Sequence, residues 1–185
     1  MAAGDPSAFV ASHPATLAFV QTPKPSPVSF ATEAYFGVTA FRFTNQHGET
    51  RYGRYRIVPG AGLEHLDGAA AQARDANYLF DELASRLAGG PIRFDLLVQV
   101  ANRDDIVDDA TIHWPAARPL APFGSIVLTA LAPDDESHRR IIFDPIPRVE
   151  GIEPSADPLL ELRAAVYLIT GRRRRQAAET HAHSS

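Results

Sequence analysis

Four short stretches of the chain are rich in apolar and aromatic residues and are bounded by turn-forming residues, a pattern typical of β-strands. They cover residues 36–43, 50–57, 94–101 and 125–132. The first two flank Asn45-Gln46-His47-Gly48, so we expect them to form a hairpin. Because side chains alternate between the two faces of a strand, Arg54 and Arg56 are predicted to share one face of the sheet.

Two further segments have helical character. Residues 6–19 form the first, with a break at His13-Pro14. Residues 67–88 form the second, because apolar side chains recur there three and four positions apart, and Gly89-Gly90-Pro91 is expected to end it. Residues 21–29 contain three prolines and are predicted to be an extended connector.

A third helix is predicted near the C-terminus, over residues 157–171. Asp157 is a capping residue type, Pro158 suits the first helical position, and Gly171 suits the end of a helix. Nearly every position between them is apolar, which predicts a helix that is buried on most sides. Residues 177–185 are polar and lack periodicity, so we expect them to form a disordered tail.

One arginine, Arg163, interrupts this apolar helix and lies four positions before Tyr167, on the same face. A buried guanidinium keeps its proton and needs an anionic partner, and a phenol beside a fixed positive charge is favoured as the phenolate. A phenolate is one of the axial ligands that proteins offer to haem iron. The alternative is a core tyrosine whose neighbouring arginine pairs with a carboxylate.

Composition and charge exclude several classes of function but do not identify one. A chain of 185 residues can form one domain with its own core, and its net charge of −4 gives no general attraction to nucleic acid or anionic membrane. The absence of cysteine excludes disulfides, thiolate ligation of haem and zinc–thiolate sites. No apolar run reaches the length that spans a membrane. The first residues lack the pattern of a secretory signal, which leaves the cytoplasm as the default expectation.

Because Arg163 lies four positions before Tyr167, the chain resembles the haem catalases, and most closely the small catalase-related peroxidases. The ligand helix of that family carries an arginine four positions before the tyrosine and another seven positions after it, which is Arg174 here. The other segments that match, in order along the chain, are residues 35–45, 51–56, 107–115 and 143–154. The resemblance covers almost the whole chain except the tail.

The resemblance implies an α+β fold built on an antiparallel β-barrel of catalase type. That barrel has eight strands, and the chain supplies about four. We therefore expect an incomplete barrel with about half of the strands, flanking helices and a buried C-terminal helix that carries the haem ligand. Residues 1–176 would form the C-terminal half of a catalase-like domain, followed by the disordered tail at 177–185. Uncovered sheet edges and apolar faces favour a homo-oligomer or a separate N-terminal half as partner.

The resemblance also implies haem as cofactor and hydrogen peroxide as substrate, with neither nucleic acid nor a membrane as partner. Tyr167 is then the axial ligand of the haem iron, and Arg163 keeps its phenolate ionised. Arg174 is implied to meet a haem propionate, which suits a fork-shaped cation. Its alternative is a solvated basic end that complements the helix dipole. We prefer that second interpretation for the other arginines of the block, Arg172, Arg173 and Arg175.

The family places a distal histidine and an asparagine in an N-terminal half that has no counterpart in this chain, so the catalytic acid–base residues are not identified. The chain is expected to be the proximal half of an enzyme that removes hydrogen peroxide with haem. The alternative is a truncated, non-catalytic haem-binding or vestigial barrel fragment. Three origins remain open: a truncated gene product, a fragment, and one piece of a split protein.

The remaining polar clusters are interpreted structurally. His113-Trp114 is expected to pack, and the aspartates at 104, 105, 108 and 109 are expected to form a solvated loop with capping roles. Metal-ligand spacing occurs among the histidines only at His181 and His183, in the predicted tail, where a disordered pair is a poor site.

Overall fold

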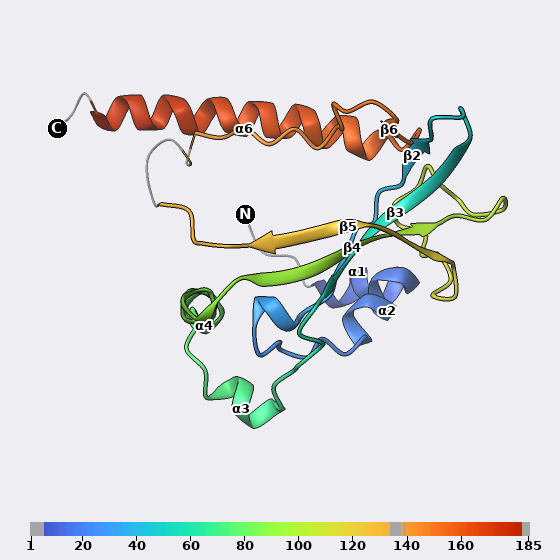
Figure 1. Ribbon diagram of the computed structural model, residues 1–185. Coiled ribbons are helices and arrows are strands. Elements are labelled where there is room, and N and C mark those ends of the chain that lie inside the picture. The colour runs from blue at the N-terminus through green and yellow to red at the C-terminus, as the bar shows by residue number, and fades with distance from the viewer. Residues whose placement is uncertain (1–5, 134–137, 139, 183–185) are drawn as a thin grey trace.

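One antiparallel sheet forms the centre of the protein in the computed structural model (Figure 1), which describes residues 6–133, 138 and 140–182. Its strands are β1 (Tyr35–Phe36), β2 (Phe41–Thr44), β3 (Thr50–Pro59), β4 (Ile92–Val100), β5 (Leu120–Leu128) and β6 (Ile152–Pro154). They follow the order β5-β4-β3-β2-β6, and β1 also pairs with β3. Within the described residues the sheet does not close on itself, so the α+β class and the incomplete barrel are confirmed.

Strands β2 and β3 form the predicted hairpin. Gly48 takes the left-handed conformation, with a φ of 77°, that the turn requires. The Asn45 side-chain oxygen accepts hydrogen bonds from the backbone N–H groups of His47 and Glu49, at 2.9 and 3.0 Å. The turn residues named from the sequence therefore set the hairpin.

The first predicted strand is divided by a wide bulge. Residues 37–40 on one strand face only residues 54–55 on β3, because the pairing continues from Phe36 with Arg56 to Phe41 with Gly53. The bulge turns Thr39 and Ala40 into the interior, where both are buried. It thereby places a threonine hydroxyl beside the strand that carries Arg54.

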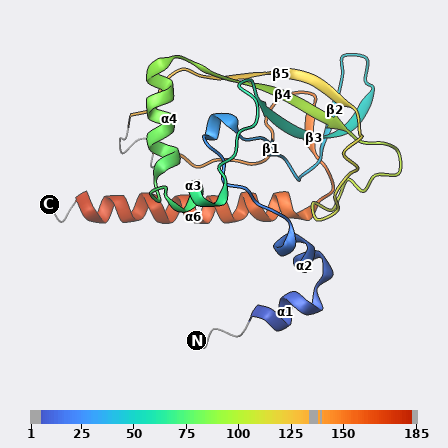
Figure 2. The same cartoon turned by 90° about the horizontal axis from the view of Figure 1, so that it is seen from below.

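The short helices lie on one side and at one end of the sheet (Figure 1). The helices α1 (Pro6–Ser12) and α2 (Pro14–Gln21) are separated at His13 as predicted, and they project away from the sheet (Figure 2). The elements η1 (Phe30–Thr32), α3 (Gly68–Gln72) and α4 (Tyr78–Gly89) follow. The core lies between η1, α4 and one end of the sheet, and consists of Ala31, Ile92 and Phe94 with Ile57, Leu83, Leu87, Ile126 and Leu128 packed against them.

Two further predictions of element boundaries are wrong, and one strand was missed. Residues 67–88 form two helices rather than one, because Asp67 caps α3 through a 2.7 Å bond from the Ala70 N–H and the helix ends before α4 begins. Strand β5 begins at Leu120 rather than at residue 125, because an edge strand tolerates Pro122. Strand β6 was not predicted, because three residues carry no pattern of their own.

The last helix, α6 (Pro158–Ala182), lies on the opposite side of the sheet from α3 (Figure 1). Asp157 precedes it as predicted, and one carboxylate oxygen accepts a 2.9 Å bond from the Leu159 N–H. The prediction that Gly171 ends the helix is wrong, because α6 continues to Ala182. Residues 177–182 of the predicted tail are therefore helical, and residues 183–185 lie outside the described part of the chain.

Gly171 has a packing role instead. A Cβ atom at this position would lie 2.4 Å from Cγ1 and 2.7 Å from Cδ1 of Ile142, far closer than carbon atoms approach. Only a glycine lets residues 140–142 lie against α6 at this distance. Arg174 and Arg175 extend the same contact by donating to the backbone carbonyls of Ile141 and Arg140, at 3.0 and 3.2 Å.

Candidate functional site

The face of α6 that packs against the rest of the chain carries Arg163 and Tyr167, the two residues identified as candidates from the sequence. Burial recurs at helical spacing along this face, from fully buried Leu160 through half-buried Arg163 and Tyr167 to buried Gly171. The opposite face is exposed, although it is apolar. The prediction of a helix buried on most sides is therefore wrong for this chain, because the described elements cover only one face of α6.

Arg163 and Tyr167 contact each other as their spacing predicts. The guanidinium Nη2 of Arg163 donates a 3.0 Å hydrogen bond to the phenol oxygen of Tyr167, and its Cζ lies 5.6 Å from the centre of the ring. Among the described residues the phenol oxygen has no second hydrogen-bond partner. A cationic donor stabilises a phenolate over a phenol, and the phenol oxygen keeps lone pairs for a metal. This donor set fits an axial ligand of haem iron.

Arg174 lies on the same face, seven residues after Tyr167, but its side chain is exposed and bonded to the Ile141 carbonyl. Arg172, Arg173 and Arg175 are also exposed. A propionate contact of Arg174 stays a prediction.

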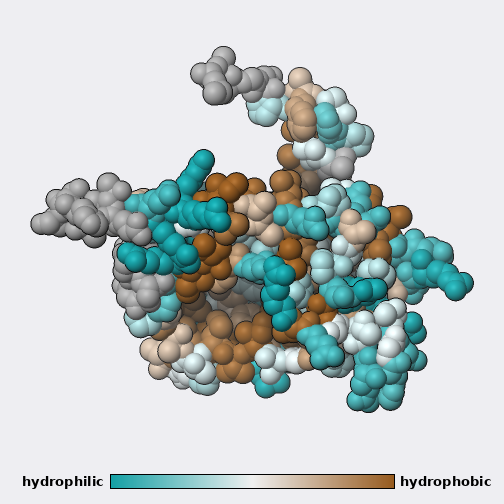
Figure 3. Space-filling model, turned by 90° about the horizontal axis from the view of Figure 1, so that it is seen from above, coloured by the Kyte–Doolittle hydropathy of each residue, from teal (hydrophilic) through white to brown (hydrophobic). Residues whose placement is uncertain are grey.

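The outward face of α6 presents an apolar stripe to solvent. Leu159, Leu162, Val166 and Ile169 are spaced by three and four residues, and Leu162 is 61% exposed. Figure 3 looks onto this side of the molecule and shows hydrophobic side chains gathered in the middle of the face, beside hydrophilic ones. An apolar stripe on a helix is normally covered, so the exposed side chains identify a surface that the described part of the chain leaves bare.

A buried polar cluster lies on the sheet face that carries Arg54 and Arg56. Arg54 is only 3% exposed, donates to the carbonyls of Ile112 (2.7 Å) and Asp109 (3.2 Å), and stacks on Trp114 with Cζ 4.2 Å from the ring. The pKa of the Arg54 guanidinium is lowered, mainly by burial and next by the charge of Arg56, although nearby carboxylates oppose this.

Arg56 is the second cation of this face. It donates to the Gly37 carbonyl at 3.1 Å and to the Gln99 side chain, and burial lowers the pKa of its guanidinium. Sequence reasoning placed both arginines on one face but did not identify their burial. The signal available was Gln99, a polar residue inside an apolar stretch, which lies opposite Arg54 in the neighbouring strand.

The other sequence candidates have structural roles. Trp114 is 7% exposed and its indole N–H donates to the Ile106 carbonyl at 2.8 Å, so the predicted packing role is confirmed for Trp114. The same prediction is wrong for His113, which is exposed. Asp109 caps the following turn through two bonds from Thr111, and Asp105 pairs with Arg118 at 2.7 Å. In the part of the chain that the structure describes, no His, Asp or Glu cluster could hold a metal ion. Nor is any described helix both long and apolar enough to cross a bilayer.

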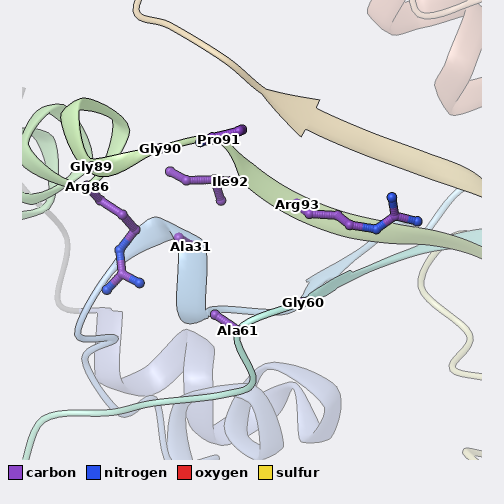
Figure 4. Close-up of a pocket in the computed structure, with 9 residues that line it drawn as sticks. All are labelled: Ala31, Gly60, Ala61, Arg86, Gly89, Gly90, Pro91, Ile92 and Arg93. Carbon is purple, nitrogen blue, oxygen red and sulfur yellow. The ribbon is translucent and has the colours of Figure 1, made fainter.

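A surface hollow of about 480 Å³ lies away from these residues. Figure 4 shows its lining, which comes from η1, the end of α4, the start of β4 and the segment after β3. None of the lining residues belongs to α6. The hollow is therefore separate from the site around Tyr167.

Comparison with known proteins gives a consistent assignment. The catalase family model matches residues 8–182. A catalase-related peroxidase of Mycolicibacterium paratuberculosis is 40% identical over 144 residues, which is 76% of this chain and 45% of that protein. Another, of Synechococcus elongatus, is 36% identical over 157 residues, which is 84% of this chain and 46% of that protein. The chain thus spans about half the length of the curated relatives it matches.

Solved structures agree on the fold. Catalase A from Saccharomyces cerevisiae superimposes with a TM-score of 0.69 at 23% identity, over 80% of this chain and 33% of that one. A bacterial catalase gives a TM-score of 0.68 at 24% identity, over 80% of this chain and 31% of that one. About four fifths of this chain therefore has the fold of the corresponding part of these larger proteins.

Proposed function

The chain belongs to the catalase family, and from that membership we propose that it is the haem-ligand part of an enzyme that removes hydrogen peroxide. The family match confirms the resemblance drawn from the segments around Arg163 and Tyr167. The observation that supports the proposal within this chain is the 3.0 Å hydrogen bond from Arg163 to the Tyr167 oxygen. Haem is the expected cofactor because the family depends on it.

The proposal assigns a role to each of three residues of α6. The Tyr167 oxygen would hold the haem iron, and haem held there would supply the redox chemistry toward peroxide. Arg163 would orient this oxygen and supply a charged hydrogen bond to it. Arg174, on the same helical face, would turn its guanidinium from the Ile141 carbonyl to a propionate. No residue of this chain is proposed as the acid–base group that moves the peroxide proton.

The proposal is tested by titrating ferric haem into the purified chain and recording the absorption spectrum. We expect Tyr167→Phe to abolish the high-spin phenolate spectrum, because no oxygen ligand remains. Tyr35→Phe is a matched control, since Tyr35 is exposed and its hydroxyl donates to the Phe30 carbonyl, away from α6. If Tyr167→Phe leaves the haem spectrum unchanged, Tyr167 is an ordinary structural tyrosine and the proposal is wrong.

A second candidate is a haem-binding chain without turnover, favoured by the bare apolar stripe of α6 and the open sheet. Oxygen release from peroxide separates the two candidates. Haem-loaded chain that releases oxygen at catalase-like rates is an enzyme in its own right. A chain that binds haem through Tyr167 but releases no oxygen is the non-catalytic form, or it needs a partner that supplies the acid–base group.

A further inference from the structure

Two exposed charges lie at the ends of the uncovered face of α6. Glu161 lies in the first turn of the helix and Arg172 lies past the apolar stripe, and both side chains are exposed. Eleven residues separate them, about three turns of an α-helix, so both lie on the same flank of α6. Within the described part of the chain, neither side chain has a hydrogen-bond or ion-pair partner. An unpaired carboxylate and an unpaired guanidinium therefore border one surface.

The surface between these two charges is apolar. Leu162 is 61% exposed and Ile169 is 51% exposed. Ala165 lies between them on the same face, and its short side chain lets another helix approach closely. Figure 1 shows α6 as the outermost described layer on its side of the sheet, and Figure 3 shows hydrophobic side chains gathered on that side. An exposed face of this kind fits a second helix with complementary charges.

The charges of α6 select the orientation of that helix. Glu161 is at the acidic start of α6, whereas Arg172 begins a block of four arginines. A parallel copy of α6 would place the two arginine blocks side by side, where they repel each other. An antiparallel copy places the arginine block of one helix beside the glutamate of the other, and it also brings together opposite ends of the two helix dipoles. The face is therefore complementary to itself in the antiparallel orientation.

Two-fold symmetry then sets the register of the pair. Across a two-fold axis each contact between unlike residues is made twice, once in each direction. An axis that crosses α6 midway between Glu161 and Arg172 brings each of these residues level with the other residue of the second copy. Ala165 lies close to this axis, with Leu162 and Ile169 on either side of it along the helix. Apolar side chains thus occupy the centre of the contact, and two ion pairs flank it.

We propose that the exposed face of α6 binds the same face of a second copy of the chain, as an antiparallel pair of helices with two reciprocal ion pairs between Glu161 and Arg172. An anionic bilayer is the other occupant that an apolar face beside arginines can fit. Glu161 favours the second copy, because a carboxylate on this flank would face the lipid phosphates. Tyr167 lies on the opposite side of α6, so the interface goes beyond the proposed function and does not rest on it.

Sedimentation velocity of the full chain over a range of concentrations measures the association. We expect the parent to form a dimer, and Glu161→Arg and Arg172→Glu each to weaken the dimer by about 10- to 100-fold, because two attractive pairs become two repulsive ones. Glu64→Arg and Arg103→Glu are matched controls, since both residues are exposed, lie outside α6 and undergo the same changes of charge. These controls should dimerise as the parent does.

An equal mixture of the two α6 variants is the decisive measurement. Glu161→Arg leaves arginine at both positions and Arg172→Glu leaves glutamate at both, so two unlike copies form two opposite-charge pairs again. We expect the mixture to dimerise at concentrations where each variant alone is a monomer. A mixture that stays monomeric overturns the proposal. Variants that dimerise as tightly as the parent overturn it as well, because the interface then lies elsewhere, such as at the open edge of the sheet.

Two further measurements complete the test. Circular dichroism checks that each variant folds, and if one does not, Ile169→Asn decides, because a dimer as tight as the parent's would overturn the proposal. A parent that is monomeric up to about 100 μM also overturns it. In that case, sedimentation of the parent with vesicles of phosphatidylserine and phosphatidylcholine would identify a bilayer as the occupant of this face instead.

Discussion

Gly171 offers a sharp test of how α6 is held against residues 140–142. In the interior of a helix, replacing glycine by alanine ordinarily stabilises a protein by about 1 kcal/mol. Here the added Cβ would lie 2.4 Å from Cγ1 of Ile142, and Cγ1 cannot move without moving the rest of that side chain. Forcing an extra carbon into such a contact costs about 1–3 kcal/mol. We expect Gly171→Ala to lower the free energy of unfolding by about 1 kcal/mol net.

A second glycine supplies the control. Gly89 is the last residue of α4, and a Cβ atom there would meet nothing within 4 Å. We expect Gly89→Ala to raise the free energy of unfolding by up to about 1 kcal/mol. The two substitutions have the same chemistry, so the opposite signs isolate the contact with Ile142.

Urea unfolding followed by circular dichroism measures both values. The double variant Gly171→Ala with Ile142→Ala should lose less stability than the sum of the two single variants, by about 1–2 kcal/mol, because the clash disappears with the isoleucine. If Gly171→Ala stabilises the protein as Gly89→Ala does, residues 140–142 do not lie against α6, and the explanation given for the glycine is refuted.

Other predictions follow from the polar contacts. Arg163→Ala should weaken haem binding, measured by titration with ferric haem, by about 10- to 100-fold, because a charged hydrogen bond to the phenol oxygen is lost. Trp114→Phe should lower the free energy of unfolding by about 1–3 kcal/mol, through the lost bond to Ile106 and the weaker stacking, and unchanged stability would contradict this. The hydrogen bond from Arg118 lowers the pKa of Asp105, so its stabilising effect is present above about pH 4 and is lost as the pH falls through the lowered value. Unfolding midpoints should therefore fall less on acidification in Asp105→Asn than in the parent.

The sequence predicted those parts of the fold that depend on interactions between residues adjacent in the chain. The hairpin at Asn45 to Gly48, the break before Pro14 and the cap at Asp157 each depend on a few adjacent residues. Strand β6 and the role of Gly171 depend instead on segments distant in sequence, Phe41–Thr44 and Ile142, so no local pattern could predict them.

The candidate site likewise has one part that local sequence predicted and one part that it did not. The contact between Arg163 and Tyr167 was predictable because both lie on one helix at a spacing of four. The buried state of Arg54 was not, because it arises from Trp114 and the carbonyls of Ile112 and Asp109, which only tertiary structure brings next to β3. An arginine inside a strand is usually exposed at an edge, and the alternation of side chains gives its face but not what covers it.

The pairing of β6 with β2 has a consequence for the order of folding. Strands β2, β3, β4 and β5 are neighbours in sequence as well as in the sheet, so each can pair with the one before it as soon as it is synthesised. β6 must instead return to β2, where Pro154 meets Phe41 across most of the length of the chain. The sheet is therefore expected to form early, and β6 and the helix that follows it to dock late. The contact that closes the longest loop also docks α6, so a cofactor bound by α6, as proposed above, would enter before this contact forms or while it is open.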